Sequence, residues 1–180
     1  MRTTILAALA LTASLPVAAQ IAPGAVAPDF TTQGALAGKE FTLNLKKQLK
    51  KGPVVLYFYP MSFTPGCSAE AQAFAAATPE FKAAGATVIG MAADPIGKLK
   101  DFSTKDCASK FAVAQATPAI IDGYDVALKR NGTKTAMTSR TSFVITPDGK
   151  VIYAHSDMSP APHIRNTLAA VKEWHAKRSK

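Results

Sequence analysis

Cysteine is scarce in this sequence of 180 residues, which has only Cys67 and Cys107. Glu70 stands where a C-x-x-C motif starting at Cys67 would need its second cysteine, so the close pair of a dithiol motif is absent. The three histidines are scattered, and no Cys-His set with metal-site spacing is visible. No phosphate-binding glycine loop or haem motif occurs either. We therefore expect no metal and no cofactor.

Acidic residues are also few: the sequence has 12 Asp and Glu but 21 Lys and Arg, which gives a net charge of +9. The basic residues are dispersed, apart from one cluster at Lys46, Lys47, Lys50 and Lys51. A nucleic-acid binder would show aromatic platforms or a basic motif beside such a cluster, and neither is present. We expect no nucleic-acid partner and interpret the cluster as a solvated helix face.

Long apolar runs are confined to the first residues. Arg2 precedes an apolar stretch over residues 5–15, and small residues at Val17, Ala18 and Ala19 precede Gln20. This is the pattern of a secretory signal peptide, too short for a membrane span. The sequence predicts a leader over residues 1–19, one domain over residues 20–180, and export to a bacterial periplasm.

The rest of the chain alternates between short apolar runs and helical patterns. The runs predict buried strands at 54–59 and 87–92, a short extended piece at 111–114, and a strand-turn-strand unit at 141–154 around Pro147-Asp148-Gly149. Asn131-Gly132 predicts a hairpin. Helical segments are expected after Cys67, from Thr78-Pro79 to Gly85, from Asp94 to Cys107, over 119–124, and at the end, with Ile164, Leu168, Val171 and His175 on one stripe. This order predicts an α/β sandwich: a mixed sheet with helices on both faces.

Cys67 lies where the strand at 54–59 turns, through Pro65 and Gly66, into a helix. The start of a helix offers free backbone N–H groups and the positive end of its dipole, and both favour an anion. A thiol in this place ionises more readily than a free cysteine, which is what a nucleophile requires.

The segment Pro60-x-x-x-Thr64-x-x-Cys67, with Glu70 and the later Arg140-Thr141-Ser142-Phe143, resembles the active-site signature of the peroxiredoxins. Tyr57-Phe58-Tyr59-Pro60 and Thr64-Pro65-Gly66-Cys67 resemble the branch called bacterioferritin comigratory protein, or peroxiredoxin Q. The resemblance covers about residues 24–174. It implies a thioredoxin-like fold and a thiol peroxidase of antioxidant defence that reduces hydrogen peroxide and organic hydroperoxides.

The resemblance also implies roles for the residues of the signature. Cys67 attacks the peroxide, Arg140 stabilises the thiolate and binds the peroxide, and Thr64 orients it. Pro60 shields the sulfur from water, and Glu70 orients Arg140. Each residue has a simpler interpretation: Thr64 caps the helix, Pro60 ends the strand, Glu70 favours the helix dipole, and Arg140 is a surface cation.

Cys107 is expected to be the resolving cysteine. In one subgroup of the family the resolver lies five residues after the attacking cysteine, but that position is Gln72 here. In another it lies on the next helix, which Cys107 roughly matches. The resemblance therefore implies an intramolecular Cys67–Cys107 disulfide, reset by a thioredoxin-like reductant, in a monomer or weak dimer. The polar neighbours of Cys107 predict a mobile segment whose unwinding is easy.

Two other functions stay open at this stage. One is a thioredoxin-like disulfide carrier without peroxidase activity, and the other is a binding domain whose two cysteines form a permanent structural disulfide. Within the peroxidase interpretation, Met61, Ser62 and Phe63 replace the polar or acidic residues usual in this loop. They predict an apolar rim that favours organic hydroperoxides.

Overall fold

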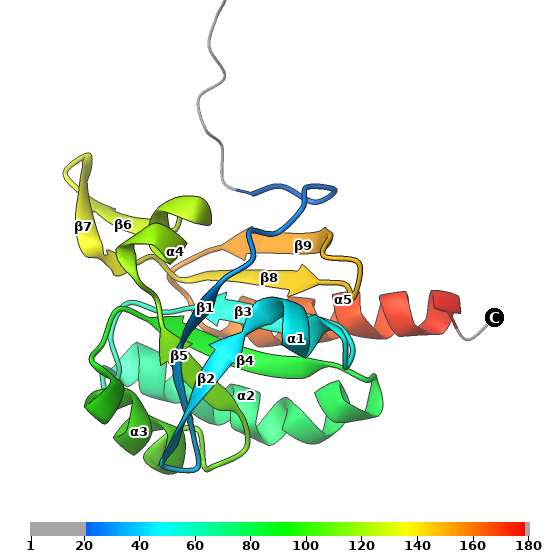
Figure 1. Ribbon diagram of the computed structural model, residues 1–180, viewed down its shortest axis with the longest axis horizontal. Coiled ribbons are helices and arrows are strands. Elements are labelled where there is room, and N and C mark those ends of the chain that lie inside the picture. The colour runs from blue at the N-terminus through cyan, green and yellow to red at the C-terminus, as the bar shows by residue number, and fades with distance from the viewer. Residues whose placement is uncertain (1–20, 179–180) are drawn as a thin grey trace, which may run out of the picture.

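The computed structural model describes residues 21–178 as a seven-stranded sheet with helices on both faces (Figure 1). The strand order is β2-β1-β5-β4-β3-β8-β9. The strands of the sheet are β1 (Thr31–Leu36), β2 (Lys39–Asn44), β3 (Val54–Phe58), β4 (Thr87–Ala92), β5 (Ala112–Gln115), β8 (Thr141–Ile145) and β9 (Val151–Ser156). Strands β3, β4 and β5 are parallel, and the flanking strands join them antiparallel, so the sheet is mixed as predicted.

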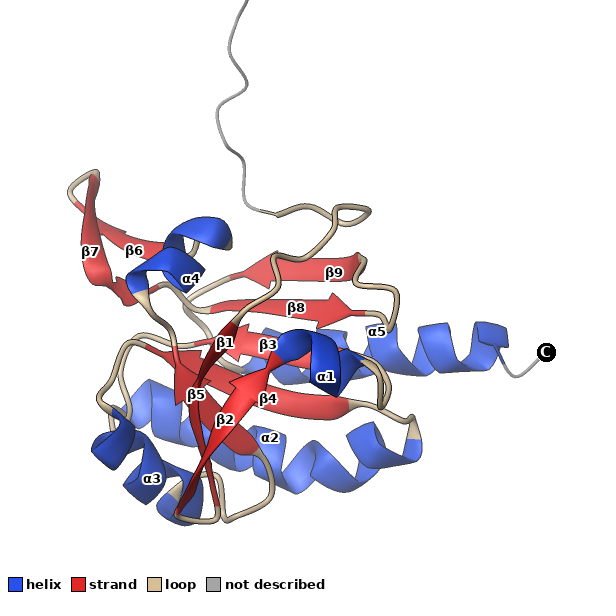
Figure 2. Cartoon of the chain, in the orientation of Figure 1, coloured by secondary structure: helices blue, strands red, loops and turns tan. Residues whose placement is uncertain are grey.

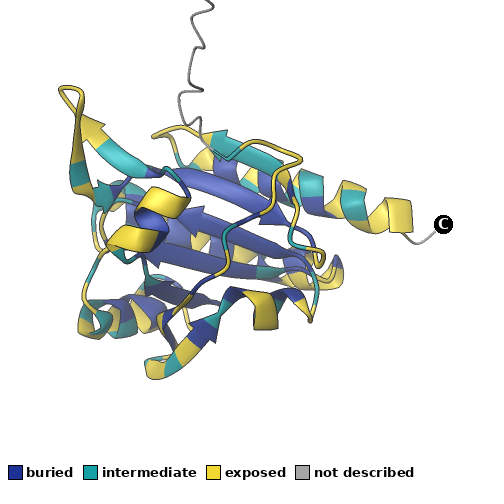
Figure 3. Ribbon diagram, turned by 45° about the horizontal axis from the view of Figure 1, so that its top comes forward, coloured by how far each residue is buried: buried dark blue, intermediate teal, exposed yellow. Residues whose placement is uncertain are grey.

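The side chains of β3 alternate between two apolar cores. Val54, Leu56 and Phe58 belong to one core, whereas Val55 and Tyr57 belong to the other. Successive residues of a strand point to opposite faces, so a strand in the middle of a sheet covered on both sides is apolar at every position. All five residues of β3 are buried, which confirms the predicted central strand (Figure 3).

Five helices cover the sheet (Figure 2). Helices α1 (Leu45–Leu49) and α4 (Pro118–Gly123) contribute to the core that contains Phe58. Helices α2 (Pro65–Ala83), α3 (Ile96–Lys105) and α5 (Ala161–Arg178) contribute to the core that contains Tyr57. The helix that carries Cys67 therefore packs on the same face as α3 and α5.

A separate hairpin projects from the body of the molecule. It pairs β6 (Ala127–Arg130) with β7 (Thr133–Thr138). Asn131 and Gly132 form its two-residue turn with φ angles of 50° and 78°, the left-handed geometry that matches the twist of a hairpin. The hairpin predicted from Asn131-Gly132 is confirmed.

Helix α2 contradicts the prediction that a new helix starts at Thr78-Pro79. One helix runs through Pro79 to Ala83. Pro79 has no N–H to donate to the preceding turn, but the Thr78 hydroxyl donates to the Phe74 carbonyl at 2.9 Å. Phe74 and Phe81 are both fully buried in one core. The burial of these two rings on a continuous helix outweighs the loss of one hydrogen bond.

Several boundaries also differ from the sequence-based expectations. The hairpin of β1 and β2 was not predicted. Helix α3 ends at Lys105, before Cys107. His175 is exposed and does not share the buried side of α5 with Val171. The predicted leader over residues 1–19 lies outside the described residues, and none of the helices within residues 21–178 is long and apolar enough to cross a membrane.

Candidate active site

Cys67 lies in the first turn of α2, directly after the loop that leaves β3. Its side chain is only 2% exposed. The Ser68 N–H donates to the Thr64 carbonyl at 2.8 Å, so helical hydrogen bonding starts there. The N–H groups of Gly66 and Cys67 precede Ser68, the first helical donor, and remain available to an anion beside the sulfur.

Arg140 lies directly before β8, the strand that pairs with β3, and its guanidinium reaches Cys67. Its Nη2 lies 3.5 Å from Cys67 Sγ, its Nη1 forms an ion pair with Glu70 Oε2, and its Nε donates to the Met158 carbonyl at 3.0 Å. Arg140 is only 4% exposed and is therefore not a surface cation. A Cβ on Gly66 would lie 3.3 Å from Nη2, so glycine at this position lets the guanidinium approach the helix closely.

Glu70 is fully buried one turn after Cys67 and faces Arg140. Burial raises the pKa of Glu70 to about 8, although the Arg140 guanidinium opposes this shift. Its Oε1 has no hydrogen-bond partner among the described residues. A protonated Glu70 still accepts a hydrogen bond from Arg140 and leaves the positive charge of the guanidinium to the sulfur.

The raised pKa of Glu70 predicts a pH-dependent stability. Because the pKa is about 8 in the folded protein and usually 4.5, the folded state keeps a proton that the unfolded chain releases in this interval. The stabilisation is complete below pH 4.5 and is lost as the pH rises through 8. Urea unfolding at about pH 5, 7 and 8.5 is expected to show a larger loss of stability in the wild type than in Glu70→Gln. Parallel curves for the two proteins would contradict the shifted pKa.

Thr64 and Pro60 flank the loop that presents Cys67. The Thr64 hydroxyl donates to the Met61 carbonyl at 3.0 Å and does not cap the helix, contrary to its simpler interpretation. Its oxygen can still accept a further hydrogen bond. Pro60 is half-buried. The residue before it, Tyr59, donates its N–H to the Met91 carbonyl of β4 at 3.0 Å, directly after the end of β3. Pro60 thus ends the strand, and its role as a shield stays a prediction.

A set of buried polar contacts that the sequence analysis missed fixes the shape of this loop. The Ser62 N–H donates to Asp94 Oδ2 at 2.7 Å, and the Ser62 hydroxyl lies 3.2 Å from the Tyr59 hydroxyl. The Thr138 hydroxyl donates to the Tyr59 carbonyl at 2.6 Å. Asp94 and Thr138 lie far from the loop in sequence, so no local signal points to them.

Cys107 is placed differently from the prediction. It follows α3, and its side chain is fully buried in the same apolar core as Cys67, so its surroundings are not polar. Burial raises the pKa of its thiol. The next two residues, Ala108 and Ser109, have φ angles of 47° and 58°, a left-handed conformation that is strained for residues other than glycine. Both cysteines are free thiols.

His163 and His155 are neighbours rather than scattered side chains. Their ring centroids lie 4.9 Å apart, and the ring nitrogens of His163 lie 2.8 Å from the Ser142 hydroxyl and from the Asp157 carbonyl. Burial lowers the pKa of His163 to about 4, so it is neutral at physiological pH. No group of three or more His, Cys, Asp or Glu within residues 21–178 could hold a metal ion.

Comparison with known proteins agrees with this geometry. A sequence profile of the AhpC/TSA family matches residues 23–154. The chain is 34% identical over 126 residues to a protein named peroxiredoxin Bcp from Xanthomonas campestris. The match covers 69% of this chain and 78% of that protein.

Solved structures give the same fold. Peroxidoxin BcpB from Mycobacterium tuberculosis superposes with a TM-score of 0.76 and 28% identity, over 85% of this chain and 97% of that one. The bacterioferritin comigratory protein of Xanthomonas campestris superposes with a TM-score of 0.70 and 29% identity, over 79% of this chain and 91% of that one. That structure was determined to study the protein's alkyl peroxide reduction activity. The predicted thioredoxin-like fold is confirmed.

Proposed function

This chain belongs to the AhpC/TSA family and is a peroxiredoxin, a thiol-dependent peroxidase, and we propose that Cys67 is the residue that attacks the peroxide. The observation that carries this assignment is the contact of 3.5 Å between Arg140 Nη2 and Cys67 Sγ. An arginine is always charged, so it stabilises the thiolate at any working pH. The relatives are peroxiredoxins, which disfavours a disulfide carrier without peroxidase activity.

The attack transfers one oxygen to sulfur. The Cys67 thiolate bonds to one peroxide oxygen, the O–O bond breaks, and the other oxygen leaves with the bonding electrons and takes a proton as water or an alcohol. The sulfur is oxidised to a sulfenic acid. Arg140 and the N–H groups at the start of α2 donate hydrogen bonds where negative charge develops, and Thr64 accepts one from the peroxide proton.

Cys107 then condenses with this sulfenic acid to form a disulfide and water. Both cysteines border the same core, but two Cα atoms must come within about 7 Å for a bridge. Gln72 on α2 contacts Asp106, the residue before Cys107, at 3.2 Å, and we propose that this contact opens and the buried Cys107 side chain leaves its packing as the bridge forms. The strained residues after Cys107 favour this opening. A thioredoxin-like reductant returns both thiols to the reduced state.

One rapid-mixing experiment tests both assignments. The reduced protein is mixed with one equivalent of hydrogen peroxide, thiol loss is followed in time, and the product is mapped by mass spectrometry. The wild type is expected to give a Cys67–Cys107 disulfide, Cys107→Ser to stop at a Cys67 sulfenic acid, and Cys67→Ser to lose thiol no faster than a free cysteine. Fast oxidation of Cys67→Ser would overturn the role of Cys67. A wild-type product that stays at the Cys67 sulfenic acid, or that is a Cys67–Cys67 disulfide between two copies, would overturn the role of Cys107.

The loop residues Met61 and Phe63 support a preference for organic hydroperoxides. They are 39% and 41% exposed, and Met158, whose carbonyl binds Arg140, is 55% exposed. Apolar side chains at a site entrance favour an alkyl group over water. We expect Phe63→Ser to lower kcat/KM for cumene hydroperoxide several-fold with little change for hydrogen peroxide. Equal losses for both peroxides would contradict an alkyl contact.

The site of action and the assembly are also proposals. The pattern of residues 1–19 supports export to the periplasm, and the family resemblance supports a monomer or weak dimer. Expression of the full chain in a bacterium, followed by osmotic-shock fractionation and mass determination, is expected to give periplasmic protein that begins at Gln20. Full-length protein in the cytoplasm would contradict export. Sedimentation of the released protein measures the assembly.

A further inference from the structure

A cavity lies at the end of the sheet opposite to Cys67. Its volume is about 380 Å³, within the roughly 300–1,000 Å³ of small-molecule sites. It lies where β4 and β5 begin, whereas Cys67 follows the end of the parallel strand β3. Its apolar lining consists of Leu36, Phe41, Leu43, Phe81, Val88, Ile89 and Phe111, with Ala86 and Ala112.

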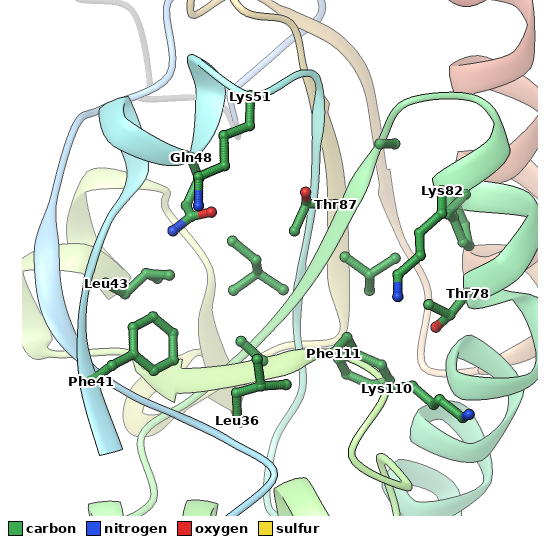
Figure 4. Close-up of a pocket in the computed structure, with 15 residues that line it drawn as sticks. Leu36, Phe41, Leu43, Gln48, Lys51, Thr78, Lys82, Thr87, Lys110 and Phe111 are labelled. Carbon is green, nitrogen blue, oxygen red and sulfur yellow. The ribbon is translucent and has the colours of Figure 1, made fainter. Parts of the chain in front are cut away.

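Three lysines surround this apolar lining, and none of the lining residues is acidic. Figure 4 shows Lys51, just after α1, and Lys82, on α2, on opposite sides of the cavity, with Lys110 at its edge. None of these three lysines forms an ion pair within residues 21–178; several other lysines there are also unpaired, whereas Lys98, Lys100, Lys134, Lys172 and Lys177 form ion pairs. The cavity therefore has an excess of positive charge beside an apolar floor.

We propose that this cavity binds a single-chain fatty acid, with the alkyl chain on the apolar floor and the carboxylate attracted by the positive charge of Lys51 and Lys82. The bound chain would cover Leu36, which is 41% exposed, and the half-buried Phe41. A volume of about 380 Å³ suits one small molecule rather than a protein segment. Charge complementarity selects a carboxylate over a neutral or cationic head group.

Calorimetric titration of the reduced protein with laurate, below its micelle concentration, tests this site. Laurate is expected to bind, whereas dodecanol and dodecyltrimethylammonium, which carry comparable chains with neutral and cationic heads, bind at least about tenfold more weakly. The double variant Lys51→Glu/Lys82→Glu is expected to bind laurate about tenfold more weakly. Lys46→Glu/Lys47→Glu is the matched control, because these two exposed lysines of α1 do not line the cavity.

Three results would each overturn the site: no laurate binding, equal binding of the cationic amphiphile, or equal loss of affinity in the two double variants. None of these measurements involves peroxide or a change in a cysteine. A failure of this proposal is therefore distinguishable from a failure of the proposed peroxidase chemistry.

A bound fatty acid would also hold the Cys107 segment in place, a consequence that rests on the proposed role of Cys107. Phe111 forms part of the cavity wall, and the Lys110 N–H donates to the Cys107 carbonyl at 2.9 Å. Laurate at about ten times its dissociation constant is expected to slow disulfide formation about tenfold and to leave the oxidation of Cys67 unchanged. If both steps slow equally, laurate acts at Cys67 and the coupling is wrong.

Discussion

Replacing Arg140 by lysine is expected to lower the rate constant for oxidation of Cys67 by hydrogen peroxide by about 100- to 1,000-fold, as loss of one such donor does in other enzymes. Lysine keeps the charge but carries its donors on one atom. It cannot reach Cys67, Glu70 and the Met158 carbonyl together, as the guanidinium does. The measurement is stopped-flow mixing of the reduced protein with excess peroxide.

Arg165→Lys is the matched control, because Arg165 is exposed on α5 and, within residues 21–178, its guanidinium hydrogen-bonds to the adjacent Asn166 alone. Its rate constant is expected to equal that of the wild type. Circular dichroism and urea unfolding of Arg140→Lys separate loss of chemistry from loss of fold. A folded Arg140→Lys that reacts within tenfold of the wild-type rate would show that the guanidinium does not stabilise the transition state.

Replacing Phe74 by alanine is expected to lower the free energy of unfolding by about 3–5 kcal/mol, the usual cost of removing a buried phenylalanine ring. Phe74 is fully buried on α2, and its ring stacks on Tyr57 at 4.3 Å and lies 5.9 Å from the ring of Phe81. Removing a fully buried ring leaves a cavity in the core, which adds to the cost. Urea unfolding under reducing conditions measures the change.

Phe63→Ala serves as the comparison for this cost. Phe63 is 41% exposed and makes one edge-to-face contact with Phe102, at 5.2 Å between ring centroids. We expect it to lose about 1 kcal/mol or less, since a ring half in water contributes less burial. Similar losses for Phe74→Ala and Phe63→Ala would mean that the core around Tyr57 relaxes around the space left by Phe74.

Much of the fold could be predicted because β3 and its neighbours carry strong local signals. The continuous apolar run of β3 indicates a strand covered on both faces, and the Pro65-Gly66 turn places Cys67 at the start of a helix. The meeting of Cys67 with Arg140 is not local. It was anticipated from the family resemblance, and in the structure it arises because β8 pairs with β3.

The features that were predicted wrongly depend on tertiary packing. Pro79 has the local signature of a helix start, and only the burial of Phe74 and Phe81 shows that the helix continues through it. Cys107 has polar neighbours in sequence, but the turn after α3 directs its side chain alone into the core. The Met158 carbonyl, which holds Arg140, is a backbone group and leaves no mark in a sequence.

The packing of Cys107 in the reduced protein also sets how readily the disulfide accepts electrons. The dithiol form keeps the buried contacts of Cys107, and the proposed opening to a disulfide would remove them. Stabilising the dithiol form makes a disulfide more oxidising, and each 1.4 kcal/mol of lost packing raises the reduction potential by about 30 mV. In the proposed cycle, a buried resolving cysteine therefore favours reduction of the disulfide by a thioredoxin-like donor.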